Sequence, residues 1–149
     1  MKKIFTLLFM MLVLTACTKA TGDEVIKNDY KFIGKSEHWK AEYIYKGVEI
    51  WGDDDEKKTY SNEDSYEFVL TYKGSLKELS SMRKLEYSYK TASGGGNRIE
   101  DFTEPPNNLT FTSGGGSKGG AKVSEDEVIQ VNVKWDEFEE SFELHNKNN

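Results

Sequence analysis

The sequence IQVNVKW at residues 129–135 decides the fold class. Its apolar residues alternate with polar ones, and a period of two is typical of a β-strand with one buried and one solvated face. Phe142 and Leu144 repeat the pattern after an acidic turn at residues 136–140. We therefore expect these two segments to form a β-hairpin that ends the domain.

The same alternation recurs through most of the preceding chain, and polar or glycine-rich segments separate the strands. Leu76, Leu79 and Met82 are spaced for a short helix or an ordered loop. We expect an all-β fold, namely an immunoglobulin-like two-layer antiparallel β-sandwich of about seven to eight strands. A small closed β-barrel is the alternative. The further expected strands are 39–46, 66–73 and 85–90, and shorter ones at 48–50, 99–102 and 109–111.

The N-terminus carries a second informative pattern. Lys2 and Lys3 precede an apolar run at residues 4–14, and a basic start, a short apolar stretch and small residues are marks of a secretory signal peptide. The run is too short for a membrane-spanning helix, which needs about 20 apolar residues. The segment LTAC at residues 14–17 resembles the lipobox of bacterial lipoproteins.

The lipobox resemblance implies that Cys17 receives a diacylglycerol and becomes the new N-terminus after cleavage. Residues 1–16 are then a signal peptide, residues 17–28 a lipid-anchored tether, and residues 29–149 the β-sandwich domain. Two acyl chains hold a protein on a membrane durably, so the resemblance places the protein on the outer face of the cytoplasmic membrane. The alternative is a soluble secreted protein with a cysteine near the cleavage site by chance.

The body of the chain carries a second resemblance. The motif of Phe32, Gly34, Ser36 and Trp39, followed by alternating strands and a terminal tryptophan hairpin, is similar to small β-sandwich lipoproteins of Gram-positive, Bacillus-type bacteria. The resemblance covers roughly residues 30–145. It implies location and fold, and it brings no activity or active-site residues with it.

The composition excludes several classes of function. The formal net charge is −6, and removal of Lys2 and Lys3 with the signal peptide would make the chain more acidic still. An acidic surface repels nucleic acid, so we expect no nucleic-acid partner. Cys17 is the one cysteine of the chain, and its lipidation leaves no thiol for a disulfide or a thiolate metal site.

Trp51 is the strongest candidate for ligand binding. Alternation puts Val48 and Ile50 on one face and Glu49 with Trp51 on the other, which would leave a large ring exposed. An exposed tryptophan beside acidic residues can stack on a sugar or a cation, or it can cap the end of a sheet. Tyr60 is expected in the loop beyond it, as a second member of the site.

Two kinds of biased segment remain. The acidic run at residues 53–56 predicts a solvated strand connection, with a weak cation site as the alternative because hard cations prefer clustered oxygens. The glycine-rich stretches at residues 94–96 and 114–120 lack the helix that a phosphate-binding loop requires. We expect them to be flexible loops that form the rims of a recognition surface.

The sequence shows no catalytic constellation. His38 and His145 are the histidines of the chain, and neither belongs to a recognisable metal or nucleophile motif. We therefore expect a non-enzymatic binding module that needs no cofactor or metal and that contacts an envelope protein or a glycan. The alternative is a wall-active enzyme, or an enzyme inhibitor, whose site is assembled from residues distant in the sequence.

Overall fold

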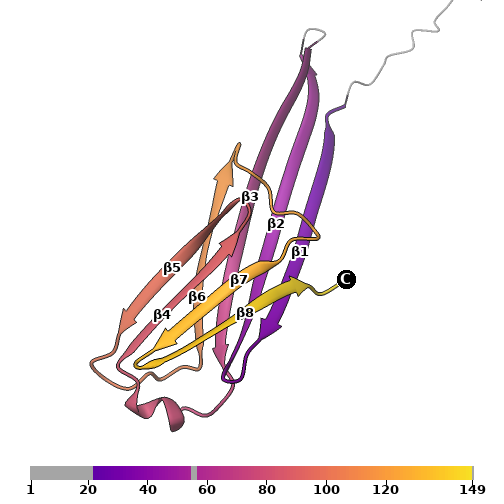
Figure 1. Ribbon diagram of the computed structural model, residues 1–149. Helices are drawn as coiled ribbons and strands as arrows, with labels where there is room; N and C mark the ends of the chain where they lie inside the picture. Colours follow the sequence, from indigo (N-terminus) through magenta and orange to yellow (C-terminus); the bar gives the residue numbers. More distant parts are fainter. Residues whose placement is uncertain (1–21, 55–56, 149) are drawn as a thin grey trace, which may run out of the picture.

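The computed structural model describes residues 22–54 and 57–148. This part of the chain forms eight antiparallel strands and a single-turn 3-10 helix (Figure 1). The all-β prediction is confirmed. The strands are β1 (Glu24–Lys35), β2 (Trp39–Asp54), β3 (Lys57–Tyr72), β4 (Lys84–Thr91), β5 (Gly94–Asp101), β6 (Thr110–Lys118), β7 (Ile129–Trp135) and β8 (Phe138–Asn146), and the helix η1 spans Glu78–Ser81.

The eight strands belong to one sheet, in the order β5-β4-β7-β8-β1-β2-β3-β6. One half-sheet consists of β1, β2, β3 and β6, and the other of β4, β5, β7 and β8. They are joined by the pairing of β1 with β8, at Phe32 with Asn146 and Ile33 with His145. Because the halves are joined, the sheet is barrel-like, as in the small-barrel alternative, and it stays open between its two end strands, β5 and β6.

Gly34 permits the approach of β1 to β8. A Cβ atom at this position would overlap the carbonyl oxygen of Glu143 and the side chain of Leu144. Side chains on this face of β1 point into the interior, as Phe32 does. Any residue other than glycine would therefore push the two half-sheets apart at the place where they join.

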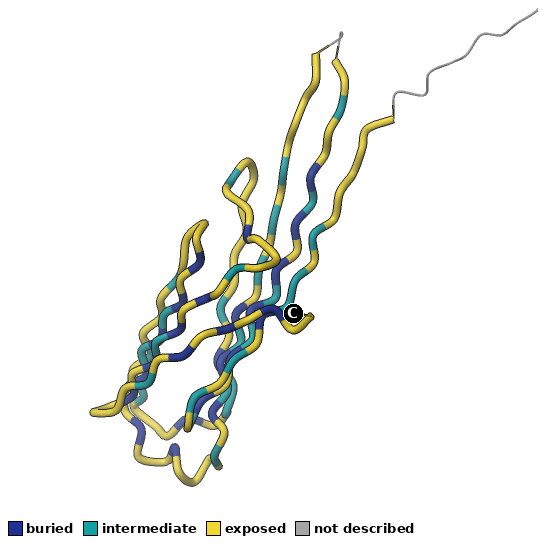
Figure 2. Tube along the Cα trace, turned by 45° about the vertical axis from the view of Figure 1, so that its right-hand side comes forward, coloured by how far each residue is buried: buried dark blue, intermediate teal, exposed yellow. Residues whose placement is uncertain are grey.

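The interior is filled by side chains of alternating residues from both half-sheets, as Figure 2 shows for the buried positions. The predicted alternation in β2, β3, β4 and β7 is confirmed, because the predicted inward residues there are nearly all buried. Aromatic rings pack on one another across the interior; Phe68 and Tyr89, for example, have ring centroids 4.4 Å apart. The largest fully buried side chains are Trp39, Tyr45, Tyr87, Phe32, Phe68, Leu70, Leu79, Met82, Leu85, Ile129, Leu144 and Val131.

Several expected boundaries differ from the structure. Strand β1 begins at Glu24, and residues 24–28 pair with β2, so the strand extends into the segment 17–28 that we expected to be a tether. The segment 48–50 is a part of β2 and not a separate strand. The terminal hairpin is confirmed, although β8 begins at Phe138, inside the expected acidic turn. The signal-peptide segment and Cys17 lie outside the described residues.

The segment around Leu79 forms the helix η1, as one of the two expected alternatives. Leu79 and Met82 are buried against the core, and Leu76 is exposed. No helix in the described ranges is long and apolar enough to cross a membrane.

Candidate functional site

The first three strands extend beyond the rest of the sheet as a ribbon (Figures 1 and 2). We define the ribbon as residues 24–29 of β1, 46–54 of β2 and 57–62 of β3. Strand β8 pairs with β1 only at residues 32–33, and β6 pairs with β3 at residues 63–71. The ribbon is therefore a three-stranded sheet without a further strand beside it in the described chain.

Exposed apolar side chains gather on the ribbon. One face carries Ile26, Trp51 and Tyr60, and the opposite face carries Val25 and Ile50; each is at least 38% exposed. These residues are half of the large apolar side chains that are exposed in the described chain. Apolar groups gathered at one exposed place mark interaction surfaces more often than isolated ones do.

Trp51 and Tyr60 form a cross-strand pair at the centre of one ribbon face. Their backbones lie opposite each other in β2 and β3, and their ring centroids are 4.5 Å apart. The expected exposure of Trp51 is confirmed, at 41%. The expected loop position of Tyr60 is wrong, because Tyr60 belongs to β3. Trp51 lies on the same face of β2 as the inward residue Tyr45. It is exposed because the ribbon extends beyond the opposite half-sheet, which therefore does not cover it.

A buried carboxylate lies beside this pair. Glu49 accepts hydrogen bonds from Asn28 (2.7 Å) and the Tyr60 hydroxyl (3.1 Å), and it forms an ion pair with Lys122 (2.7 Å). The Lys122 ammonium, followed by the two hydrogen bonds, holds the pKa of Glu49 below its usual range against the effect of burial. Glu49 thus joins all three ribbon strands to the segment between β6 and β7 and fixes the hydroxyl of Tyr60.

The acidic run begins in β2 near the tip of the ribbon. Asp53 and Asp54 lie opposite Lys58 and Lys57 in β3, while residues 55–56 lie outside the described part. Opposite charges facing each other across two strands stabilise the pairing modestly. The two described acids are therefore part of the strand pairing, with lysines as their register partners.

The seam between the end strands β5 and β6 is a second candidate site. Most inward positions elsewhere in the barrel are apolar or aromatic, but those of β5 and β6 are mostly glycine or polar. In the register, Tyr89 faces Gly96 and Tyr87 faces Arg98, whereas Tyr66 faces Gly115 and Phe68 faces Ser113. The seam is therefore poor in apolar side chains and open to hydrogen bonding.

Tyrosine hydroxyls gather at the seam. The Tyr89 hydroxyl donates a hydrogen bond to that of Tyr66 (3.2 Å), and this bond together with burial raises the pKa of Tyr66 to about 12. Burial also raises the pKa of Tyr43, which stacks on Tyr66 at 5.1 Å. Tyrosine hydroxyls can both donate and accept hydrogen bonds. A cavity of about 190 Å³ opens beside them, between Gly95 and Gly116.

The glycine-rich stretches are strands over most of their length, so the expectation of flexible loops is wrong for them. Residues 94–96 begin β5, and residues 114–118 end β6. A Cβ atom at Gly96 would overlap the hydroxyl of Tyr89, and one at Gly115 would press on the ring of Tyr66. Glycine is used here because an aromatic ring of the neighbouring strand covers the backbone. Only residues 119–120 fall beyond the strand.

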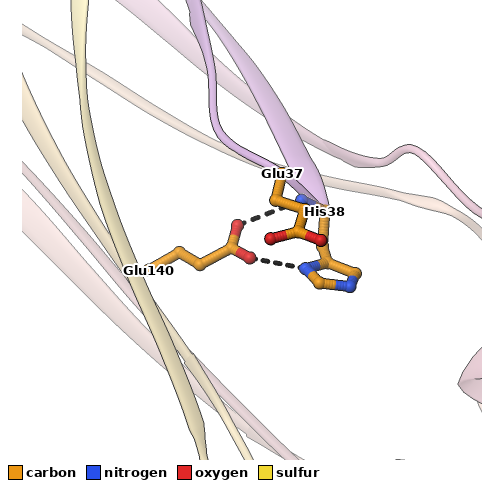
Figure 3. Close-up of side chains that lie close together, drawn as sticks. All are labelled: Glu37, His38 and Glu140. Carbon is orange, nitrogen blue, oxygen red and sulfur yellow. Dashed lines mark hydrogen bonds and ion pairs between the residues drawn. The ribbon is translucent and has the colours of Figure 1, made fainter.

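At the other end of the barrel, His38 and Glu140 form a polar cluster with Glu37 (Figure 3). Glu140 of β8 accepts hydrogen bonds from Ser36 Oγ (2.5 Å) and from the His38 backbone (3.1 Å), and its other oxygen lies 2.5 Å from His38 Nδ1. The His38 ring packs against Trp135, with centroids 5.6 Å apart. Glu140 therefore ties the turn between β1 and β2 to the opposite half-sheet.

This cluster has the donor types that zinc uses, since Glu37, His38 and Glu140 each offer a ligand atom within 4.8 Å of the others. Both oxygens of Glu140 already accept hydrogen bonds, however, and Glu37 is exposed. Ser36 Oγ bonds to the carboxylate and not to the imidazole, so the arrangement differs from a serine nucleophile activated by histidine. Its chemistry fits a structural connection better than a reaction centre.

Sequence reasoning missed both the seam and the His38–Glu140 cluster. His38 belongs to no recognisable motif, and Glu140 falls in the expected acidic turn more than a hundred positions away; a single sequence carries no signal for such a pair. The alternation indicates strands at residues 66–73 and 85–90, which hold Tyr66 and Tyr89, but it does not predict the strand order that brings these tyrosines beside two glycine strands. Comparison with protein-family models, curated proteins and solved structures finds no significant match for this chain.

Glu140→Gln should destabilise the fold in a pH-dependent manner. Burial acts to raise the pKa of Glu140, but hydrogen bonds from Ser36 and His38 outweigh it and hold the pKa below its usual range. A lowered folded-state pKa stabilises the protein above the unfolded value of about 4.3 and ceases to do so as pH falls through the folded value. We expect a loss of about 1–3 kcal/mol in unfolding free energy at neutral pH, shrinking at acidic pH.

Urea unfolding of both proteins, followed by tryptophan fluorescence at neutral and acidic pH, measures this difference. Glu139→Gln is the matched control, because its side chain is 54% exposed and its replacement should change stability by less than about 1 kcal/mol. A loss for Glu140→Gln that is equal at both pH values, or equal to that of the control, would contradict the assignment.

Proposed function

We propose that the chain is a lipid-anchored, non-enzymatic binding module on the outer face of the cytoplasmic membrane of a Gram-positive bacterium. Its contact surface is the ribbon, and its partner is a protein of the cell envelope. The single observation that carries the binding role is the exposed Trp51–Tyr60 pair, with rings 4.5 Å apart on a ribbon that protrudes from the barrel.

The chemistry of the ribbon favours a protein partner. Trp and Tyr are enriched among the residues that dominate binding energy at protein interfaces, and here they accompany Val25 and Ile50 on the opposite face. A hollow of about 640 Å³, with Tyr60 and Ile50 among its lining residues, lies at the β3 edge of the ribbon. A sugar that stacks on one aromatic ring does not require apolar side chains on both faces of the ribbon.

The start of β1 relates the anchor to this surface. Glu24 lies opposite Trp51, so the chain enters the domain at the ribbon. The residues between Cys17 and Glu24, fully extended, reach about 20–25 Å. A lipid on Cys17 would therefore hold the ribbon near the membrane surface, where its partner would be an envelope protein that is itself close to the membrane.

The proposed anchor is tested by Cys17→Ala. Loss of the thiol removes the acceptor for diacylglycerol, and two acyl chains provide most of the expected membrane affinity. We expect the variant to leave the membrane fraction or to accumulate as an uncleaved precursor, as judged by cell fractionation and intact mass. Unchanged membrane association together with an unchanged mass would contradict lipidation.

The proposed contact surface is tested by site-specific photocrosslinking on intact cells. Replacement of Tyr60 by p-benzoylphenylalanine should give a discrete protein adduct, and addition of Trp51→Ala should reduce that adduct several-fold because it removes half of the aromatic pair. The same probe in place of Phe138 is the matched control, since Phe138 is also an exposed aromatic residue, at 63%, but lies in the hairpin β7–β8.

The outcome of this experiment separates the candidate ligands. An adduct that muramidase digestion removes would identify a glycan in place of a protein. Equal labelling from the Tyr60 and Phe138 positions, or labelling at Tyr60 that is indifferent to Trp51→Ala, would contradict the ribbon as the contact surface.

A further inference from the structure

We propose that the seam between β5 and β6 binds an extended, basic peptide segment of a partner protein, which adds to β6 as a ninth strand. This binding mode gains affinity from main-chain hydrogen bonds and specificity from the pockets that receive alternate side chains. The site is separate from the ribbon and does not depend on the function proposed for it.

Strand β6 has an edge that nothing in the described chain covers. It pairs with β3 without a bulge along its whole length, and its other side has no partner strand. Natural edge strands are usually protected by charges, proline or bulges. The sequence of β6 contains no proline and carries no charge before Lys118, whereas β5 carries Arg98, Glu100 and Asp101. Of the two strands that border the seam, β6 therefore has the edge that is less protected against a further strand.

A buried hydroxyl at the seam lacks a partner. Tyr87 is fully buried, and its hydroxyl makes no hydrogen bond to any residue in the described ranges. Its side chain lies on the same inward face as that of Arg98, its register partner in β5. Burial raises the pKa of this hydroxyl, and the neighbouring Ser113 of β6 acts in the opposite direction. A buried polar group without a partner destabilises the free protein, and a guest strand entering the seam can supply the missing bond.

Two hollows flank the seam and indicate which side chains the guest carries. One, of about 190 Å³, lies near Gly116 and Ser117, and Asp64 is the one charged residue of the described chain that lines it. Tyrosine rings and a carboxylate favour a Lys or Arg side chain there. The other, of about 250 Å³, lies near Thr110 and Thr112. At about 3.3 Å per residue, guest residues roughly four to six positions apart reach both hollows.

A second copy of this chain fits the seam less well. In an antiparallel pair of two β6 strands centred on Gly114, Ser117 lies opposite Phe111, so no basic side chain comes near Asp64. The net charge of −6 also opposes self-association. A basic peptide adds a counter-charge to the Asp64 carboxylate, whose oxygens accept hydrogen bonds from Ser117, and it also covers the free strand edge.

Short linear peptides are selected from a phage-displayed library against the full chain in detergent. The affinity of the strongest binder is then measured by fluorescence polarisation. We expect the selected peptides to contain Lys or Arg. Asp64→Asn and Tyr87→Phe should each weaken binding about three- to tenfold, as loss of one ionic or hydrogen-bonded contact predicts. Tyr87→Phe should not lower the unfolding temperature, because it removes a polar group that is unpaired in the free protein.

Tyr72→Phe is the matched control, because Tyr72 lies at the other end of the barrel and bonds to Glu78; it should leave peptide affinity unchanged. The proposal is overturned if no peptide binds, if the selected peptides lack basic residues, or if Tyr87→Phe and Asp64→Asn bind as the parent does. A concentration-dependent dimer in sedimentation equilibrium, displaced by the peptide, would assign the edge to a second copy and also overturn it.

Discussion

The contact of β1 with β8 is the constraint on which the rest of the structure depends. It joins the two half-sheets at residues 32–33, and it exists because Gly34 lets β1 approach the backbone of Glu143. This join brings the aromatic faces of both halves together around one core, whose burial is the main favourable term in folding. Because β5 and β6 do not pair, the sheet closes on one side only and leaves a seam on the other.

The same architecture separates two exposed regions of different chemistry. The ribbon projects past the core, so Trp51 and Tyr60 on its inward face are exposed to solvent. Glu49 on the same face forms an ion pair with Lys122. The seam instead lies along the barrel wall and presents backbone and tyrosine hydroxyls. Apolar groups on a projecting ribbon suit contact with a folded surface, and a free strand edge suits an extended segment. On the two proposals above, one small domain would hold two partners at different places.

The sequence predicted the elements whose residues alternate and missed what depends on their arrangement in space. The inward residues of β7, such as Val131 and Val133, follow from the period of two alone, and so does the exposure of Trp51. The glycine content of the two stretches predicts loops. They are strands because Tyr66 and Tyr89, which lie on neighbouring strands, cover their inward side and leave room only for glycine. The pairing of His38 with Glu140 could not be predicted, since it is set by strand order.

Hydrogen–deuterium exchange of the full chain tests the open seam most directly. The outward amides of an edge strand have no partner strand, so they exchange faster than the hydrogen-bonded amides of the paired core. We expect rapid exchange for the β6 amides that do not bond to β3 and for the outer amides of β5, and slow exchange in β2 and β7. Uniformly slow exchange throughout β5 and β6 would show that the barrel closes and would contradict the account.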